Sequence, residues 1–205
     1  MSRPVMQDAR RAEILEAAIR VLARDGLAET TTRKIATEAN VNQAMLRYYF
    51  GSKDDLLFAV LQEMMRVTEE IVRSVATVSG SLREVIEASL KAFWEHVESA
   101  PELQVMQYEL TLYALRNPES AWLAKQQYGG YSAVVEAIIE QACTTTGQPC
   151  ATPFPTLARF IIGGLDGLIL QFISDRDTAR ARSDLDYLIK SVIALVEGTI
   201  PLFPA

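Results

Sequence analysis

Apolar residues recur at helical spacing along most of the chain, and no segment shows the strict alternation typical of a β-strand. Ile14, Ala18, Val21 and Leu22 fall at i, i+4, i+7 and i+8, which predicts a helix over residues 8–24 that Gly26 ends. Residues 1–7 are expected to form a mobile tail. Similar spacing predicts further helices, and the fold class is therefore expected to be all-α. They cover residues 53–77, 82–99, 102–116, 119–143, 156–175 and 185–199, with a loop at 144–155.

The segment Thr30–Lys53 is predicted to form two short helices joined by a tight turn. Thr31 or Thr32 can cap the first helix, because a hydroxyl accepts from the unpaired N–H groups there. Asn40 suits the turn, since asparagine tolerates left-handed backbone angles, and Asn42 can cap the second helix. This is the arrangement of a helix-turn-helix, whose second helix enters the major groove of DNA.

The outer face of that second helix is expected to read the DNA. Leu46 and Phe50 are four residues apart and should face the core. Glutamine pairs with adenine, arginine with guanine, and apolar side chains touch the thymine methyl, whereas tyrosine and lysine contact phosphates. Cations in the first turn of the first helix oppose its dipole and indicate an external anion, as at Arg33 and Lys34. The predicted DNA-binding residues are Thr32, Arg33, Asn42, Gln43, Ala44, Met45, Arg47, Tyr48, Tyr49 and Lys53.

A family resemblance is carried by residues at fixed spacing in the first third of the chain. They are Ala17-Ala18, Gly26, Thr31-Thr32, Ile35-Ala36, Ala39, Val41, Leu46, Tyr48-Tyr49-Phe50, Ser52-Lys53 and Leu56-Leu57. Together they resemble the N-terminal domain of TetR-type transcriptional repressors. The resemblance implies a DNA-binding domain at residues 8–53 and, at 54–205, a domain that binds a small molecule and dimerises. Beyond residue 60 it rests on architecture alone.

Charge is distributed unevenly along the chain, whose net charge is −6. Residues 1–53 contain nine Lys or Arg and six Asp or Glu, a net +3, whereas the remainder contains eleven and twenty, a net −9. A basic module on an acidic body is expected when one end of a molecule meets phosphate.

Aromatic residues concentrate in the middle of the chain, where seven of the sixteen fall between residues 93 and 131. Polar residues such as His96 and Gln104 are interleaved with them. Polar groups among aromatics describe either a small-molecule pocket or ordinary packing at the edge of a core. The resemblance favours the pocket. The predicted ligand-binding residues are Phe93, Trp94, Tyr108, Glu109, Tyr113, Trp122 and Tyr128.

The last two predicted helices carry more apolar surface than one small body needs, which indicates an interface. Pairing them with their two-fold mates predicts a homodimer whose reading helices meet a palindromic operator. Three glycines at 163–167 should allow close helix contact or make room for a ligand. The predicted interface residues are Phe160, Leu168, Phe172, Leu188, Val192 and Val196.

Other chemistry is poorly represented in the sequence. His96 is the only histidine, and Cys143 and Cys150 form no CxxC motif, so neither a metal site nor a catalytic site is expected. The apolar run at 160–173 is interrupted by Asp166 and Gln171 and is too short to span a bilayer. With no apolar N-terminal segment, the chain is expected to be cytoplasmic, without cofactor or membrane.

These observations favour a ligand-responsive transcriptional repressor that a small-molecule effector releases from DNA. Two alternatives from other classes stay open at this point. One is a helical protein that binds a small molecule without any DNA function, and the other is an enzyme.

Overall fold

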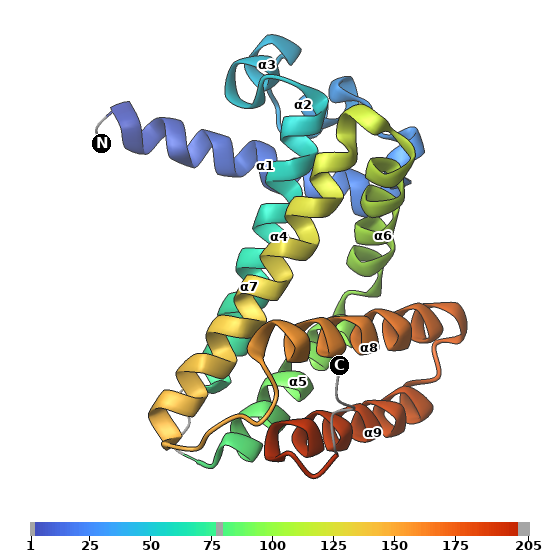
Figure 1. The fold of residues 1–205 in the computed structure, drawn as a ribbon. Helices are drawn as coiled ribbons and strands as arrows, with labels where there is room; N and C mark the ends of the chain where they lie inside the picture. Colours follow the sequence, from blue (N-terminus) through green and yellow to red (C-terminus); the bar gives the residue numbers. More distant parts are fainter. Residues whose placement is uncertain (1–2, 77–79, 201–205) are drawn as a thin grey trace. The chain divides into compact units, whose positions relative to one another are not determined.

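The computed structural model describes residues 3–76 and 80–200, and within them the chain forms helices and no strand (Figure 1). The all-α fold class is thereby confirmed. The helices are α1 (Arg3–Glu29), α2 (Thr32–Glu38), α3 (Gln43–Phe50), α4 (Lys53–Ala76), α5 (Leu82–Ser99), α6 (Pro101–Arg116), the 3-10 turn η1 (Pro118–Ser120), α7 (Ala121–Thr146), α8 (Phe154–Asp175) and α9 (Thr178–Glu197).

Several boundaries differ from the sequence-based expectation. Helix α1 runs past a kink at Gly26 to Glu29, although Gly26 was expected to end it, and α7 runs to Thr146, inside the expected loop. Helix α1 begins at Arg3, so the expected tail is wrong for residues 3–7, while residues 1 and 2 lie outside the described range. Helix α8 begins at Phe154, because Pro155 falls in the first turn, where its missing N–H costs nothing. Helix α9 begins at Thr178 rather than at residue 185, since Asp177 accepts a hydrogen bond from the Arg180 backbone N–H at 3.0 Å and caps a polar first turn.

The described chain divides into two compact units. One comprises the described parts of Met1–Met64 with Glu102–Gln127, and the other Met65–Pro101 with Tyr128–Ala205. Helix α6 therefore belongs spatially with the N-terminal helices. Its Met106 and Leu110, 1% and 2% exposed, share one apolar core with Ile14, Leu46 and Leu57.

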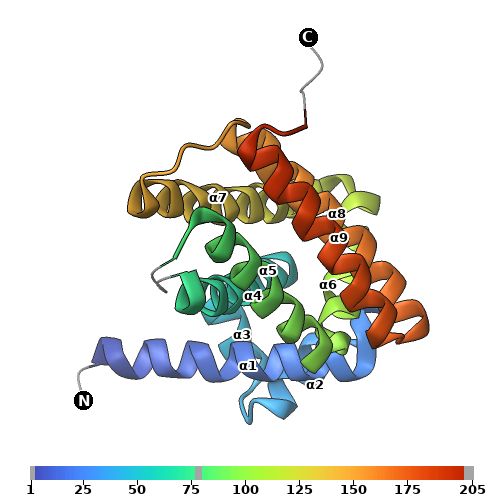
Figure 2. The ribbon, with the colours of Figure 1, turned by 90° about the horizontal axis from the view of Figure 1, so that it is seen from below.

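In the second unit, α8 and α9 lie side by side, as two views show (Figures 1 and 2), and α5 contacts α9. Gly164 explains part of this packing, because a Cβ at that position would lie 2.6 Å from Cδ1 of Leu188. The close helix contact expected at the glycines is thus found at Gly164. A Cβ at Gly163 or Gly167 would meet no described atom within 4 Å.

Candidate DNA-binding surface and effector pocket

Local capping bonds shape the helix-turn-helix as the sequence predicts. The Thr31 hydroxyl accepts from the Lys34 backbone N–H at 3.2 Å, and the Asn42 side chain accepts from the Met45 N–H at 2.9 Å. Asn40 adopts the left-handed conformation with φ 51°, which closes the turn between α2 and α3. Leu46 and Phe50, 4% and 7% exposed, fix the inner face of α3 in the core.

The outer face of α3 borders a hollow of about 620 Å³. Gln43, Ala44 and Arg47 are exposed on it, whereas Met45, predicted to be exposed, is half-buried. The hollow brings predicted base readers and predicted phosphate contacts into one concave surface. It is lined by Thr32, Gln43, Ala44, Leu46, Arg47, Tyr48, Phe50, Gly51, Ser52, Lys53 and Leu56.

The predicted phosphate contacts are held by aromatic and polar neighbours. Tyr48 is 72% exposed, and its hydroxyl accepts from the Gln7 side-chain amide at 3.3 Å. Tyr49 is half-buried and packs edge-to-face against Tyr48, with ring centroids 5.2 Å apart. The Lys53 ammonium lies 5.9 Å from the ring centroid of Tyr113, within the range of a cation–π contact.

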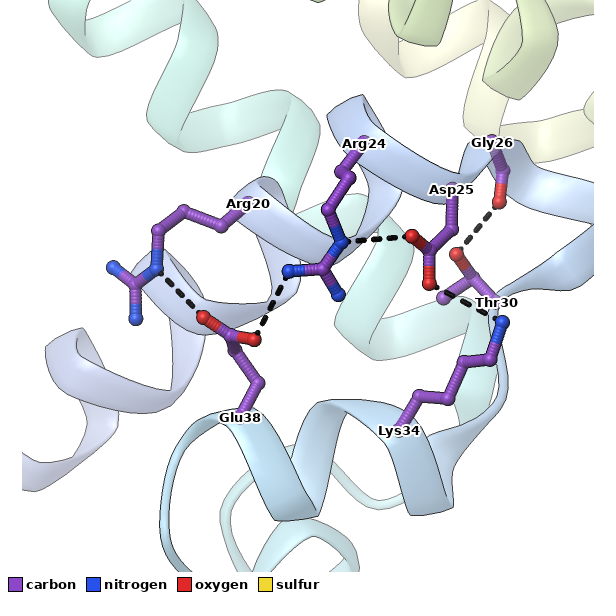
Figure 3. Close-up of polar contacts among 7 residues, drawn as sticks. All are labelled: Arg20, Arg24, Asp25, Gly26, Thr30, Lys34 and Glu38. Carbon is purple, nitrogen blue, oxygen red and sulfur yellow. Dashed lines mark hydrogen bonds and ion pairs between the residues drawn. The ribbon is translucent and has the colours of Figure 1, made fainter.

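A charged network joins α1 to α2 (Figure 3). Glu38 of α2 bonds to Arg20 at 3.1 Å and Arg24 at 3.3 Å, while Asp25 bonds to Arg24 at 2.8 Å and lies 3.2 Å from the Lys34 ammonium. The Arg24 guanidinium lowers the pKa of Asp25, and the Arg20 guanidinium lowers that of Glu38. Each exposed ion pair contributes little alone, but together they tie α2 to α1.

This network corrects the interpretation of one cation. Lys34 was expected to face an external anion, yet its charge is matched by Asp25 inside the protein. Arg33 is exposed and forms no ion pair with the residues that the structure describes, so it remains suited to phosphate.

Helix α6 and the turn after it bond directly to the helix-turn-helix module. The Glu109 carboxylate accepts from the Leu27 backbone N–H at 2.7 Å, just past the kink at Gly26, where φ is 74°. The Tyr113 hydroxyl donates to Asp54 at 2.9 Å, and the Ser120 hydroxyl also donates to that carboxylate. These bonds reach both ends of the module: the end of α1 and the start of α4.

A narrow apolar cavity of about 60 Å³ lies inside the second unit, between α4, α5, α7 and α8. Most of its lining side chains are buried, and Ser89, 8% exposed, is the one polar side chain among the described residues that form it. Sequence reasoning missed Ser89, although a serine on the apolar stripe of α5 was a usable signal. The cavity is lined by Val72, Val85, Ile86, Ser89, Leu90, Phe93, Val135, Ile138, Ile139, Ala142 and Ile161.

Comparison with known proteins decides the family. Residues 14–60 match the sequence profile of "Bacterial regulatory proteins, tetR family", and residues 74–195 match that of "Tetracyclin repressor-like, C-terminal domain". The chain belongs to the tetR family. The chain is a transcriptional regulator that binds DNA through its helix-turn-helix domain, and regulators of this family also bind small-molecule effectors.

Several named proteins are similar to this tetR-family chain. It is 30% identical to the nicotine-responsive transcriptional repressor HdnoR of Paenarthrobacter nicotinovorans, over 90% of this chain and 94% of that one. The regulator BetI of Brucella canis is 26% identical over 60% of this chain and 69% of its own. The multidrug binding protein EbrR, solved with imidazole, is 26% identical, with a TM-score of 0.63 over 96% of this chain and 97% of that one. These proteins regulate transcription or bind drugs, so the enzyme alternative is set aside.

In this tetR-family chain, the predicted ligand-binding residues do not line one common pocket but lie in several different environments. Phe93 lines the apolar cavity, and Trp94 is 1% exposed, with its ring centroid 5.8 Å from that of Phe172. Glu109 and Tyr113 instead bond to Leu27 and Asp54 as described above, Tyr108 is half-buried, and Trp122 packs edge-to-face on Phe58 at 5.1 Å.

Tyr128, the remaining member of that set, bonds to α8. Its hydroxyl donates to Asp166 at 2.9 Å, and burial, reinforced by that carboxylate, raises the pKa of Tyr128 to about 12. Burial lowers the pKa of His96. Among the described residues no cluster of three metal-ligating side chains is found, and Cys143 and Cys150 are free thiols.

Only some of the residues predicted for the dimer interface are exposed at the surface of one chain. Phe172, Val192 and Val196 are only 4%, 0% and 3% exposed within one chain, so they pack inside it and offer no surface to a partner. Phe160, 43% exposed, stays available, and Leu168 and Leu188 are half-buried. Exposed Leu170 and Tyr187 were not in the predicted set.

Helix α8 is also long and apolar enough to cross a membrane by length and composition alone. Only 28% of its most apolar window is buried within the chain. A core or interface helix of a soluble protein passes the same test, so this observation is weak evidence for a membrane span.

Proposed function

We propose that the protein is a repressor that binds a palindromic operator as a homodimer and leaves it when a small organic effector binds. The observation that carries the DNA part is the concave surface of α3. There Gln43 and Arg47 are exposed above a buried Leu46, and Lys53 stands at the edge. These side chains suit bidentate base contacts and a phosphate contact respectively.

On this proposal residues 8–53 form the DNA-binding domain, and residues 54–205 form the domain that binds the effector and dimerises. The homodimer is supported by the exposed apolar stripe of α8, where Phe160, Gly163, Gly167 and Leu170 follow one another at helical spacing. Two copies paired through α8 and α9 would form an isologous four-helix contact and set their reading helices about one DNA turn apart.

The effector part is supported by the relatives and by the cavity beside α5. HdnoR is named for its response to nicotine, and EbrR has been solved with imidazole and with ethidium, all of them small organic molecules. The route to the DNA-binding domain is supported by α6, whose Glu109 and Tyr113 hold the end of α1 and the start of α4. A shift of α6 would move those two helix ends and change the placement of α3. A cytoplasmic location follows from this function.

A gel-shift with the DNA upstream of the protein's own coding sequence tests the proposal. We expect a retarded complex that an excess of unrelated DNA does not remove, and a footprint that is symmetric about one centre. Arg47→Ala should remove the specific complex, while the exposed α6 variant Arg116→Ala, outside the concave surface, should retain it. A protein that binds specific and unrelated DNA equally would contradict the proposal.

A further inference from the structure

The hydroxyl of Ser89 is anomalous within its helix. Serine inside a helix commonly bonds back to a carbonyl three or four residues earlier, as Ser99 does to His96 at 2.8 Å and Ser191 does to Tyr187 at 2.9 Å. The Ser89 oxygen is buried and has no hydrogen-bond partner among the described residues. An unpaired buried polar group destabilises a fold by roughly 1–3 kcal/mol, so its presence needs an explanation.

The surroundings of Ser89 supply one. Ser89 lines the apolar cavity, whose other walls include Ile86, Leu90, Ile138 and Ile139, all buried. These residues are buried within the second unit, and the volume of about 60 Å³ is too small for a protein segment, so the cavity suits a small chemical group. No charged side chain appears among its described lining residues.

We propose that this cavity receives a neutral, compact apolar group of the effector, and that Ser89 donates its single hydrogen bond to a carbonyl or ether oxygen of that group. This inference rests on the effector-responsive function proposed above and names the chemical class of ligand. A charged end of an effector would stay outside this cavity, because an unpaired ion among apolar walls is strongly disfavoured. The volume of about 60 Å³ suits a group of a few carbon atoms, since roughly 150 Å³ holds a benzene ring.

Three probes of the same size and shape, each with three heavy atoms, test the proposal on the whole chain: dimethyl ether, propane and dimethylammonium. Binding is followed by methyl NMR at Val85, Ile86, Ile138 and Ile139. We expect dimethyl ether to shift these methyl signals with a saturable response, propane to shift the same signals, and dimethylammonium to leave them in place.

Ser89→Ala is the decisive variant. It should weaken binding of dimethyl ether by roughly 2- to 12-fold, the loss of one net hydrogen bond, and should not weaken binding of propane. Its melting temperature should equal or exceed that of the wild type, because the change removes an unpaired buried hydroxyl. Ala142→Val, which fills the cavity, should abolish binding of both neutral probes.

The proposal is overturned if Ser89→Ala binds dimethyl ether as tightly as the wild type, if dimethylammonium shifts the same methyl signals, or if dimethyl ether shifts none of them. None of these results depends on DNA. The gel-shift of the ligand-free protein described above judges the repressor function by itself, so failure of one proposal is distinguishable from failure of the other.

Discussion

Adjacent residues of α3 face opposite environments, because each residue turns the helix by about 100°. Leu46 is 4% exposed while Arg47, the next residue, is exposed beside the concave surface. The neighbouring cations of α2 also differ: Lys34 pairs with Asp25, whereas Arg33 forms no ion pair with a residue that the structure describes. Whether a cation is available to DNA therefore depends on its partners inside the fold as well as on its position along the helix.

The first prediction separates base reading from phosphate contact. Gln43→Ala should relax base preference at one position per half-site, at about 1–3 kcal/mol for a bidentate pair. Lys53→Ala should weaken binding to all duplexes alike and reduce the slope of log K against log salt by roughly one unit. Binding to a panel of operator variants at several salt concentrations measures both. The orientation of α3 described here is wrong if Lys53→Ala alters the sequence preference and Gln43→Ala does not.

The second prediction concerns the carboxylate of Glu98, which accepts from Trp94 Nε1 at 2.8 Å and from Arg182 Nε at 2.9 Å. The Arg182 guanidinium lowers the pKa of Glu98. Because the folded-state pKa is lowered, the ionised carboxylate stabilises the fold above its ordinary pKa, and that stabilisation is lost as pH falls through the lowered value.

Glu98→Gln tests this dependence, since glutamine keeps an oxygen for the Trp94 N–H but carries no charge. The variant should be less stable than the wild type at pH 7, and the difference should shrink between about pH 5 and pH 3. Urea unfolding at each pH measures it. A difference that stayed constant down to pH 3 would show that charge plays no part in this contact.

At the scale of elements, glycines inside helices mark where another side chain comes close. In α7, Gly130 faces Met65 of α4, so that a Cβ there would lie 2.5 Å from the Met65 sulfur. A Cβ at the neighbouring Gly129 would meet no described atom within 4 Å. The glycine pair does not interrupt α7, and the missing side chain of Gly130 leaves room for Met65 of α4.

The third prediction uses these adjacent glycines as a matched pair. Gly129→Ala should raise the free energy of unfolding by about 1 kcal/mol, the helix preference of alanine over glycine. Gly130→Ala should give a smaller gain or a loss, because the Met65 side chain must move away from the new methyl group. Denaturant unfolding of both variants decides the matter. Equal gains would mean that Gly130 serves no packing purpose.

At the scale of the whole molecule, the proposed dimer contact would have to coexist with DNA recognition in one chain. The two tetR-family profiles match residues 14–60 and 74–195 respectively. Only exposed apolar residues of α8 and α9 can serve a dimer contact, because buried ones already hold the two helices together. Leu170 and Tyr187, 49% and 67% exposed, are therefore better suited to it than Val192.

The fourth prediction tests that contact. Phe160→Glu combined with Leu170→Glu should yield monomers, leave the helical content unchanged and abolish binding to the full palindrome, because the charges would face each other across the two-fold axis. Sedimentation and gel-shift measure the two effects. The matched control is Leu112→Glu with Leu115→Glu, two exposed leucines of α6, which should stay dimeric. A monomer that held the palindrome with wild-type affinity would contradict the mechanism.

The sequence by itself determined the all-helical fold, the position of most helices and the helix-turn-helix. Those features depend on bonds between residues three or four apart, such as the caps at Thr31 and Asn42, and such bonds can be read from spacing. Its errors in boundaries fell where polar residues continue a helix without an apolar repeat, as in the first turns of α9.

The tertiary structure alone decided which elements meet, and with it the roles of several side chains. Glu109 looked like a ligand contact, but it bonds to Leu27, 82 residues earlier in the chain. Val192 was predicted to lie in the dimer interface, but it is buried within one chain. Ser89 became a candidate ligand contact only when the fold placed it in the wall of a cavity formed by four helices. Periodicity tells which face of a helix is apolar, but the choice between core, partner and ligand depends on packing between residues far apart in sequence.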